Sequence, residues 1–152
     1  KMEVLMTPET LFKDADSFGN FNNTSVVTRL YDEGYSALFL GDIAKLGADR
    51  MASLFGKYLK SDMCQVSHHG VEDVPLSFYE IVQASILYYP CNIELYDQIE
   101  RHWAVRTALE KKEYTKEILI AGCGQYARAW GTTYDADAPL VIPDHPIKGP
   151  RN

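Results

Sequence analysis

Short apolar runs recur along this chain and are separated by segments with helical character, and this alternation constrains the fold more than any other feature. A short apolar run bounded by polar or turn-forming residues is typical of a buried strand. Strands that alternate with helices predict an α/β fold. Four such runs occur, at Ser36–Leu40, Met63–Val66, Ile86–Tyr89 and Glu117–Ala121.

Three segments between these runs are predicted to be helices. Residues 75–83 open on a proline, which suits the first turn of a helix. Residues 93–112 form the clearest helix and end on two lysines, which suit the helix dipole. Residues 44–59, or 48–59 if the helix begins at the second alanine, have one apolar face with helical spacing, made of Met51, Leu54, Phe55, Tyr58 and Leu59.

A hairpin is predicted ahead of the alternating part. The segment Ser25–Tyr31 is rich in β-branched residues, and Asp32-Glu33-Gly34 is a turn to the strand that begins at Ser36. A short strand at Val4–Met6 precedes a polar segment, 14–23, that is predicted to be a loop. The sheet is therefore expected to be mixed, with antiparallel and parallel strands.

Composition restricts the class of protein. The 152 residues suit one domain, 1–152, or a fragment of one, in which 136–152 is expected to be a Pro-rich surface tail. No apolar run approaches the roughly 18 residues of a membrane helix. A net charge of −6 without a basic stripe disfavours nucleic acid as a partner. Three cysteines without a C-x-x-C pair favour a reducing, cytoplasmic compartment. Because the chain opens on Lys1 and enters a strand at once, we expect an excised segment rather than a signal peptide.

Two groups of chemically active residues follow neighbouring strands. Asp42 comes after the strand at 36–40, and the pair His68-His69 follows the strand at 63–66. Taken alone, Asp42 is an ordinary helix N-cap or turn residue and the histidines are ordinary loop residues. Two strands joined by one helix crossover are expected to be parallel neighbours, so both groups should lie at the same end of the sheet. Carboxylate and imidazole there could form a metal site or an acid–base pair.

The segments NNTSVVTRL (22–30), SALFLGD (36–42) and VSHHG (66–70) resemble hydrolases of the metallo-β-lactamase superfamily, in particular the subgroup found in DNA-uptake competence proteins. The resemblance covers about a third of the chain, from Asn22 to Phe78. It implies an αββα sandwich of which this chain is the C-terminal half, a mixed sheet with helices. It also implies two divalent metal ions, commonly zinc, bridged by Asp42. His69 is the preferred further ligand and His68 the alternative.

The family mechanism uses a metal-activated hydroxide against an ester, amide or phosphodiester, so a small ester or phosphodiester is the expected substrate class. The first family signature, H-x-H-x-D-H, is absent, because the only histidines are His68, His69, His102 and His145. A catalytic zinc site needs three protein ligands. We therefore expect the chain alone to be inactive and to bind metal weakly, as part of a parent hydrolase.

Two other functions remain open. A non-catalytic binding or assembly domain of the same fold would self-associate through an exposed half-sheet, as a homo-oligomer. A small nucleotide-binding module is suggested by Gly122-x-Gly124 with Asp144 further on, although the one glycine and two threonines at 131–133 are poor helix residues. Cys64 lies within an apolar run and is interpreted as structural, and so is a set of tyrosines at 79, 88, 89 and 96.

Overall fold

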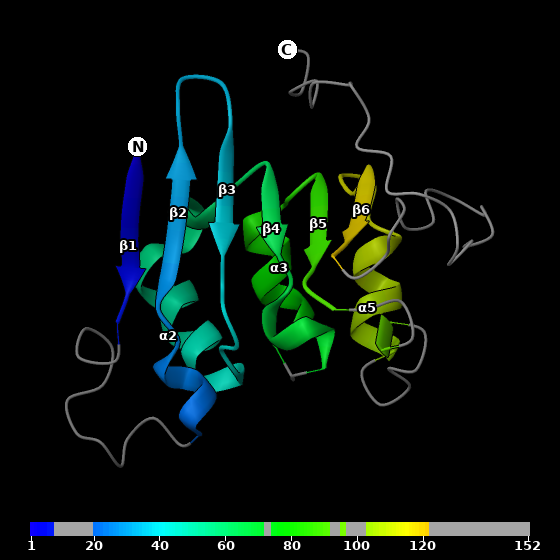
Figure 1. The fold of residues 1–152 in the computed structure, drawn as a ribbon, viewed down its shortest axis with the longest axis horizontal. Helices are drawn as coiled ribbons and strands as arrows, with labels where there is room; N and C mark the ends of the chain where they lie inside the picture. The colour runs from blue at the N-terminus through cyan, green and yellow to red at the C-terminus, as the bar shows by residue number, and fades with distance from the viewer. Residues whose placement is uncertain (8–19, 72–73, 92–94, 97–102, 122–152) are drawn as a thin grey trace.

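The computed structural model of this chain describes residues 1–7, 20–71, 74–91, 95–96 and 103–121. These residues form a six-stranded sheet whose strands lie side by side in the order of the sequence. The strands are β1 (Met2–Met6), β2 (Val27–Tyr31), β3 (Ser36–Phe39), β4 (Met63–Gln65), β5 (Ile86–Tyr89) and β6 (Glu117–Ile120). Figure 1 shows them as one continuous row of arrows.

The sheet is mixed, as the sequence predicts. Strands β1, β2 and β3 are antiparallel neighbours, whereas β3 to β6 are parallel to one another. The predicted hairpin turn is confirmed, because the Asp32 carboxylate accepts hydrogen bonds from the backbone N–H of Gly34 and Tyr35, each at 2.9 Å. These two bonds stabilise the charged form and lower the pKa of Asp32 below its ordinary value.

Helices connect the parallel strands. They are α2 (Lys45–Phe55), α3 (Leu76–Val82) and α5 (Trp103–Glu110), and Figure 1 shows them on one side of the sheet. The α/β alternation expected from the sequence is therefore confirmed. The predicted helix at 93–112 is confirmed at Trp103–Glu110, while residues 97–102, including His102, lie outside the described part. None of the helices within that described part has both the length and the apolar character needed to cross a bilayer.

Two local predictions need correction. The loop predicted at 14–23 contains, in its described part, the start of a 3-10 helix, η2 (Phe21–Thr24). The apolar face predicted for 44–59 is wrong at Leu54 and Tyr58, whose side chains are 63% and 52% exposed. Leu54 lies within the α-helix but away from its buried residues, Gly47, Ala48 and Met51. Tyr58 leaves the face because the α-helix ends at Phe55 and a 3-10 turn, η3 (Gly56–Leu59), follows, so the period of 3.6 residues does not continue.

The core lies between the sheet and the helices. Leu38, Cys64 and Leu87 are directly opposite one another on β3, β4 and β5, and all three are fully buried. Burial of Cys64 raises the pKa of its thiol and confirms the structural interpretation of this residue. Three of the four tyrosines singled out in the sequence, at 79, 89 and 96, are also buried, and Tyr88 is half-buried.

The opposite face of the sheet exposes apolar side chains on β1 and β2. Met2 lies directly opposite Leu30, and Val4 lies two residues further along the same face of β1. Their exposed fractions are 68%, 43% and 54%. None of α2, α3 and α5 packs on this face, so the apolar surface of β1 and β2 stays accessible.

The remaining sequence predictions fall on residues outside the described part. They concern a strand from Tyr126, the tail at 136–152, His145, and the Gly122, Gly124 and Asp144 pattern.

Candidate functional site

The predicted site residues lie at the carboxyl end of the sheet, by which we mean the end at which β3, β4, β5 and β6 finish. Gly41 and Asp42 follow β3, and a 3-10 turn, η4 (Ser67–Gly70), follows β4. Pro90 comes directly after β5. In Figure 1 this end is at the bottom of the sheet, where η2 also lies.

The loops after β3 and β4 are in direct contact. The backbone N–H of His68 donates to the carbonyl of Gly41 at 3.0 Å. The hydroxyl of Ser67 donates to the carbonyl of Ile43 at 2.6 Å. The expectation that Asp42 and the two histidines would meet at one end of neighbouring parallel strands is therefore confirmed at the level of the backbone.

Gln65, at the end of β4, joins these loops and was not singled out in the sequence. Its buried amide oxygen accepts from the N–H of Leu40 at 2.9 Å and of Gly41 at 2.8 Å. Its amide nitrogen donates to the carbonyls of Gly41, at 3.1 Å, and Val66, at 2.7 Å. A buried amide that uses both its donors and its acceptor fixes the backbone on either side. The sequence feature that could have pointed to this role is a glutamine within an otherwise apolar strand.

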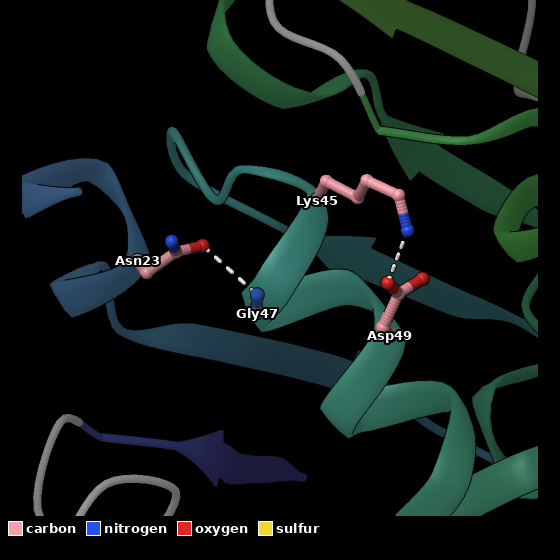
Figure 2. A network of polar contacts seen from close by, with 4 residues as sticks. All are labelled: Asn23, Lys45, Gly47 and Asp49. Carbon is pink, nitrogen blue, oxygen red and sulfur yellow. Dashed lines mark hydrogen bonds and ion pairs between the residues drawn. The ribbon is translucent and has the colours of Figure 1, made fainter. Parts of the chain in front are cut away.

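Asn23 holds the start of α2 from outside the helix (Figure 2). The N-cap residue Ala44 has no side-chain acceptor, and the buried Asn23 oxygen accepts instead from the N–H of Ala44, at 3.0 Å, and of Gly47, at 2.9 Å. A Cβ atom at residue 47 would lie 2.8 Å from this oxygen, so the contact requires glycine there. Figure 2 also shows the ion pair of Lys45 with Asp49 on the exposed side of the helix, a kind of pair worth about 0.3–0.5 kcal/mol.

Asp42 is not the N-cap of α2, because the helix begins at Lys45 after the N-cap Ala44. Its backbone N–H donates to the hydroxyl of Ser25 at 3.0 Å. Gly41 has a φ of +59°, which favours glycine. Within the described ranges no donor hydrogen-bonds to the half-buried Asp42 carboxylate. Among these residues, Asp42 is thus held through its backbone and not through its carboxylate.

The backbone of the histidine loop is strained. His68 and His69 have φ values of +46° and +57°, and Gly70 follows at +86°. A non-glycine residue in the left-handed region costs roughly 1 kcal/mol or more. Such strain persists where the surroundings enforce it, and it is concentrated at functional sites. The buried hydroxyl of Tyr79 supports this turn by accepting from the N–H of Ser67 at 3.2 Å.

Each histidine ring has a defined neighbour. Nδ1 of His69 donates to the carbonyl of Pro90 at 2.6 Å. Because a carbonyl can only accept, the proton of a neutral His69 sits on Nδ1 and Nε2 keeps its lone pair. The amide nitrogen of Asn22 donates to Nδ1 of His68 at 3.2 Å. The two ring centroids are 5.7 Å apart.

A complete metal site is not present among the residues that the structure describes. No group of three or more His, Cys, Asp or Glu side chains there is placed to hold a metal ion. No protein-family model, curated protein or solved structure matches the chain. Function therefore has to be inferred from the side chains at the carboxyl end of the sheet.

Proposed function

We propose that this chain supplies one half of a metal-dependent hydrolase site of the metallo-β-lactamase type, with Asp42 and His69 as ligands. The observation that carries the proposal is the hydrogen bond from His68 N–H to the Gly41 carbonyl, at 3.0 Å. It joins the two loops that carry Asp42 and His69, at the end of the sheet where α/β folds usually bind ligands.

The chemistry of the two side chains fits a divalent cation such as zinc. A metal-binding histidine almost always donates its other ring N–H to an oxygen acceptor, as Nδ1 of His69 does to Pro90. This leaves Nε2 as the ligating atom. The Asp42 carboxylate, without a hydrogen-bond donor among the described residues, could contribute oxygen ligands to the same cation, or to two cations.

The proposed reaction is hydrolysis of a small ester or phosphodiester. In such sites a bound divalent ion supplies an activated hydroxide and polarises the bond that is broken. Asp42 and His69 would hold and orient the ion, and the clamp made by Gln65 would keep the two loops at a fixed separation. Two ligands are too few for a catalytic zinc site, and the part of the chain that the structure describes places no third one beside them, so the proposal assigns the remaining ligands to a further segment of a parent protein. The chain by itself is then a weak metal binder without activity.

The open face of the sheet supports the sandwich architecture that this proposal requires. Met2, Val4 and Leu30 expose apolar side chains on the face that α2, α3 and α5 leave uncovered. Sheets of a sandwich pack face to face through such surfaces. A second sheet on this face would complete an αββα arrangement.

The same surface favours a second candidate, a non-catalytic assembly domain in which two copies meet. Light scattering after size exclusion separates the candidates. A concentration-dependent dimer that Leu30→Lys abolishes supports assembly through this face. A monomer at all concentrations counts against it. Leu54→Lys, on the exposed side of α2, is the matched control.

Cobalt binding tests the metal site, because Co²⁺ replaces zinc and reports its ligands in the visible spectrum. We expect Asp42→Asn and His69→Gln each to weaken Co²⁺ binding by about tenfold or more, since each removes a ligand of a site that has few. Asp49→Asn, which changes an exposed aspartate of α2, is the control. Equal Co²⁺ affinity in all four proteins would contradict the proposed site.

A further inference from the structure

A small cavity lies where η4, α3, β5 and α5 meet. Val66 and Gly70 line it from the two ends of η4, Tyr79 lines it from α3, Tyr89 from β5 and Leu109 from α5. The cavity offers about 10 Å³ to the centre of a water-sized molecule, which is close to the room that one water needs. Its size therefore suits a single water molecule and not an organic substrate.

The hydroxyl of Tyr89 is a polar group that an occupant of this cavity could satisfy. Tyr89 is fully buried, and among the residues that the structure describes its hydroxyl has no hydrogen-bond partner. Burial without a hydrogen bond is unfavourable for a hydroxyl, and most buried polar groups bind either protein or an ordered water. Burial also raises the pKa of Tyr89, so the phenol keeps its proton and can donate it.

Tyr79 brings a second hydroxyl to the lining of the same cavity. This hydroxyl accepts from the N–H of Ser67 at 3.2 Å, and its own proton has no acceptor in the described part of the chain. Burial raises the pKa of Tyr79 as well, which keeps that proton in place. A buried water needs at least two polar partners, and the two tyrosines supply them.

The charges at the cavity favour a neutral occupant over an anion. Arg106 also lines the cavity, but its charge is already balanced within the chain. Its Nε lies 3.7 Å from the carboxylate of Glu110, one turn further along α5, and its Nη1 donates to the carbonyl of Tyr96. A cation that is paired in this way does not require a further anion.

We propose that this cavity binds one structural water, held between the hydroxyls of Tyr79 and Tyr89. A chain of hydrogen bonds then runs from the N–H of Ser67 through Tyr79 and the water to Tyr89, and it ties η4 to the end of β5. Bonds in such a chain polarise and strengthen one another. The water thus helps to hold the left-handed backbone of His68 and His69, and this inference is independent of the proposed metal site.

Tyr89→Phe tests the proposal through the sign of its effect on stability. If the hydroxyl binds a buried water, its removal loses that hydrogen bond, and we expect the urea midpoint to fall by about 0.5 M. If the hydroxyl has no partner, its removal relieves an unfavourable burial and the midpoint rises. An unchanged or raised midpoint therefore overturns the inference.

Tyr35→Phe is the matched control, because the Tyr35 hydroxyl is also buried without a partner in the described part but does not line this cavity. Its urea midpoint should not fall, and an equal fall in both variants overturns the inference. A crystal structure that resolves ordered water gives the direct measurement. We expect one water within hydrogen-bonding distance of both tyrosine hydroxyls. A cavity without ordered water, or one that holds a larger molecule, also overturns the inference.

Discussion

Strand β4 is joined to β3 by a polar side chain at each of its two ends. The side chain is a carboxylate at one end and a neutral amide at the other. At the amino end of the sheet, where β3 and β4 begin, the Asp62 carboxylate accepts from the N–H of Ser36 at 2.7 Å and from its hydroxyl at 2.9 Å. At the carboxyl end the neutral amide of Gln65 makes the corresponding contacts with Leu40 and Gly41.

The two ends of the sheet use their acidic side chains differently. At the amino end the acidic group is itself the clamp, and Asp32 is likewise bound by backbone N–H groups of its turn. At the carboxyl end a neutral amide makes the clamp, so the Asp42 carboxylate is left for another role. The left-handed histidines are also at this end.

Gln65→Leu should have the largest effect. It removes four hydrogen bonds and leaves the N–H of Leu40 and Gly41 buried without an acceptor, which costs about 3 kcal/mol or more of unfolding free energy. Asp62→Asn, the counterpart at the amino end, retains an acceptor for Ser36 and should cost about 1 kcal/mol. Urea denaturation measures both values. A smaller loss for Gln65→Leu than for Asp62→Asn would reverse the comparison.

Gly47→Ala should destabilise the protein by about 1–2 kcal/mol, although alanine normally favours a helix by about 1 kcal/mol over glycine. The new Cβ would meet the Asn23 oxygen at 2.8 Å. In an Asn23→Ala background the clash is removed, and the same substitution should become stabilising. This double-mutant cycle is read from urea midpoints.

Gly34→Ala, in the hairpin turn at the amino end, is the matched control for residue 47. A Cβ there meets no atom within 4 Å, so the change should be close to zero. A destabilisation equal to that of Gly47→Ala would show that the contact with Asn23 is not the cause.

Replacement of a left-handed residue by glycine tests whether its backbone conformation lowers the stability of the protein. His68→Gly and Gln83→Gly should each raise the unfolding free energy by up to about 1 kcal/mol, because both residues have φ near +50°. Gln83 caps α3 at the amino end of the sheet, where glycine is the preferred residue. Thermal denaturation measures the gain. No gain in either variant would contradict the backbone strain at these two positions.

The smallest effect concerns pH. The pKa of Asp32 is lowered in the folded chain, so its contribution to stability is present above the unfolded pKa and is lost as pH falls through the folded value. Asp32→Asn should therefore lose less stability than the wild type when the urea midpoint is compared at about pH 7 and about pH 2.5. Glu33→Gln, next in the same turn, is the control. Identical acid sensitivity in the wild type and Asp32→Asn would contradict the role of the turn.

The sequence predicts local structure well and tertiary contacts of polar side chains poorly. The strands at 36–40, 63–66 and 86–89 are found because apolar runs and crossover rules act over short distances, and the same rules bring Asp42 near His68. The roles of Gln65 and Asn23 are not predictable in this way. Their partners are backbone N–H groups more than 20 residues away, at Leu40 and Gly47, and only the assembled sheet brings them together.

The carbonyl of Gly41 accepts from the N–H of His68 and from the amide of Gln65, and the N–H of Gly41 donates to the Gln65 oxygen. A loop that is bound in this way cannot open without breaking contacts of the sheet itself. The amide protons of Gly41 and His68 should therefore exchange with solvent as slowly as those of β3 and β4, rather than at the rate of a surface loop. Any ligand that this end of the sheet binds would then meet a rigid platform, and rearrangement on binding would have to occur elsewhere in the chain.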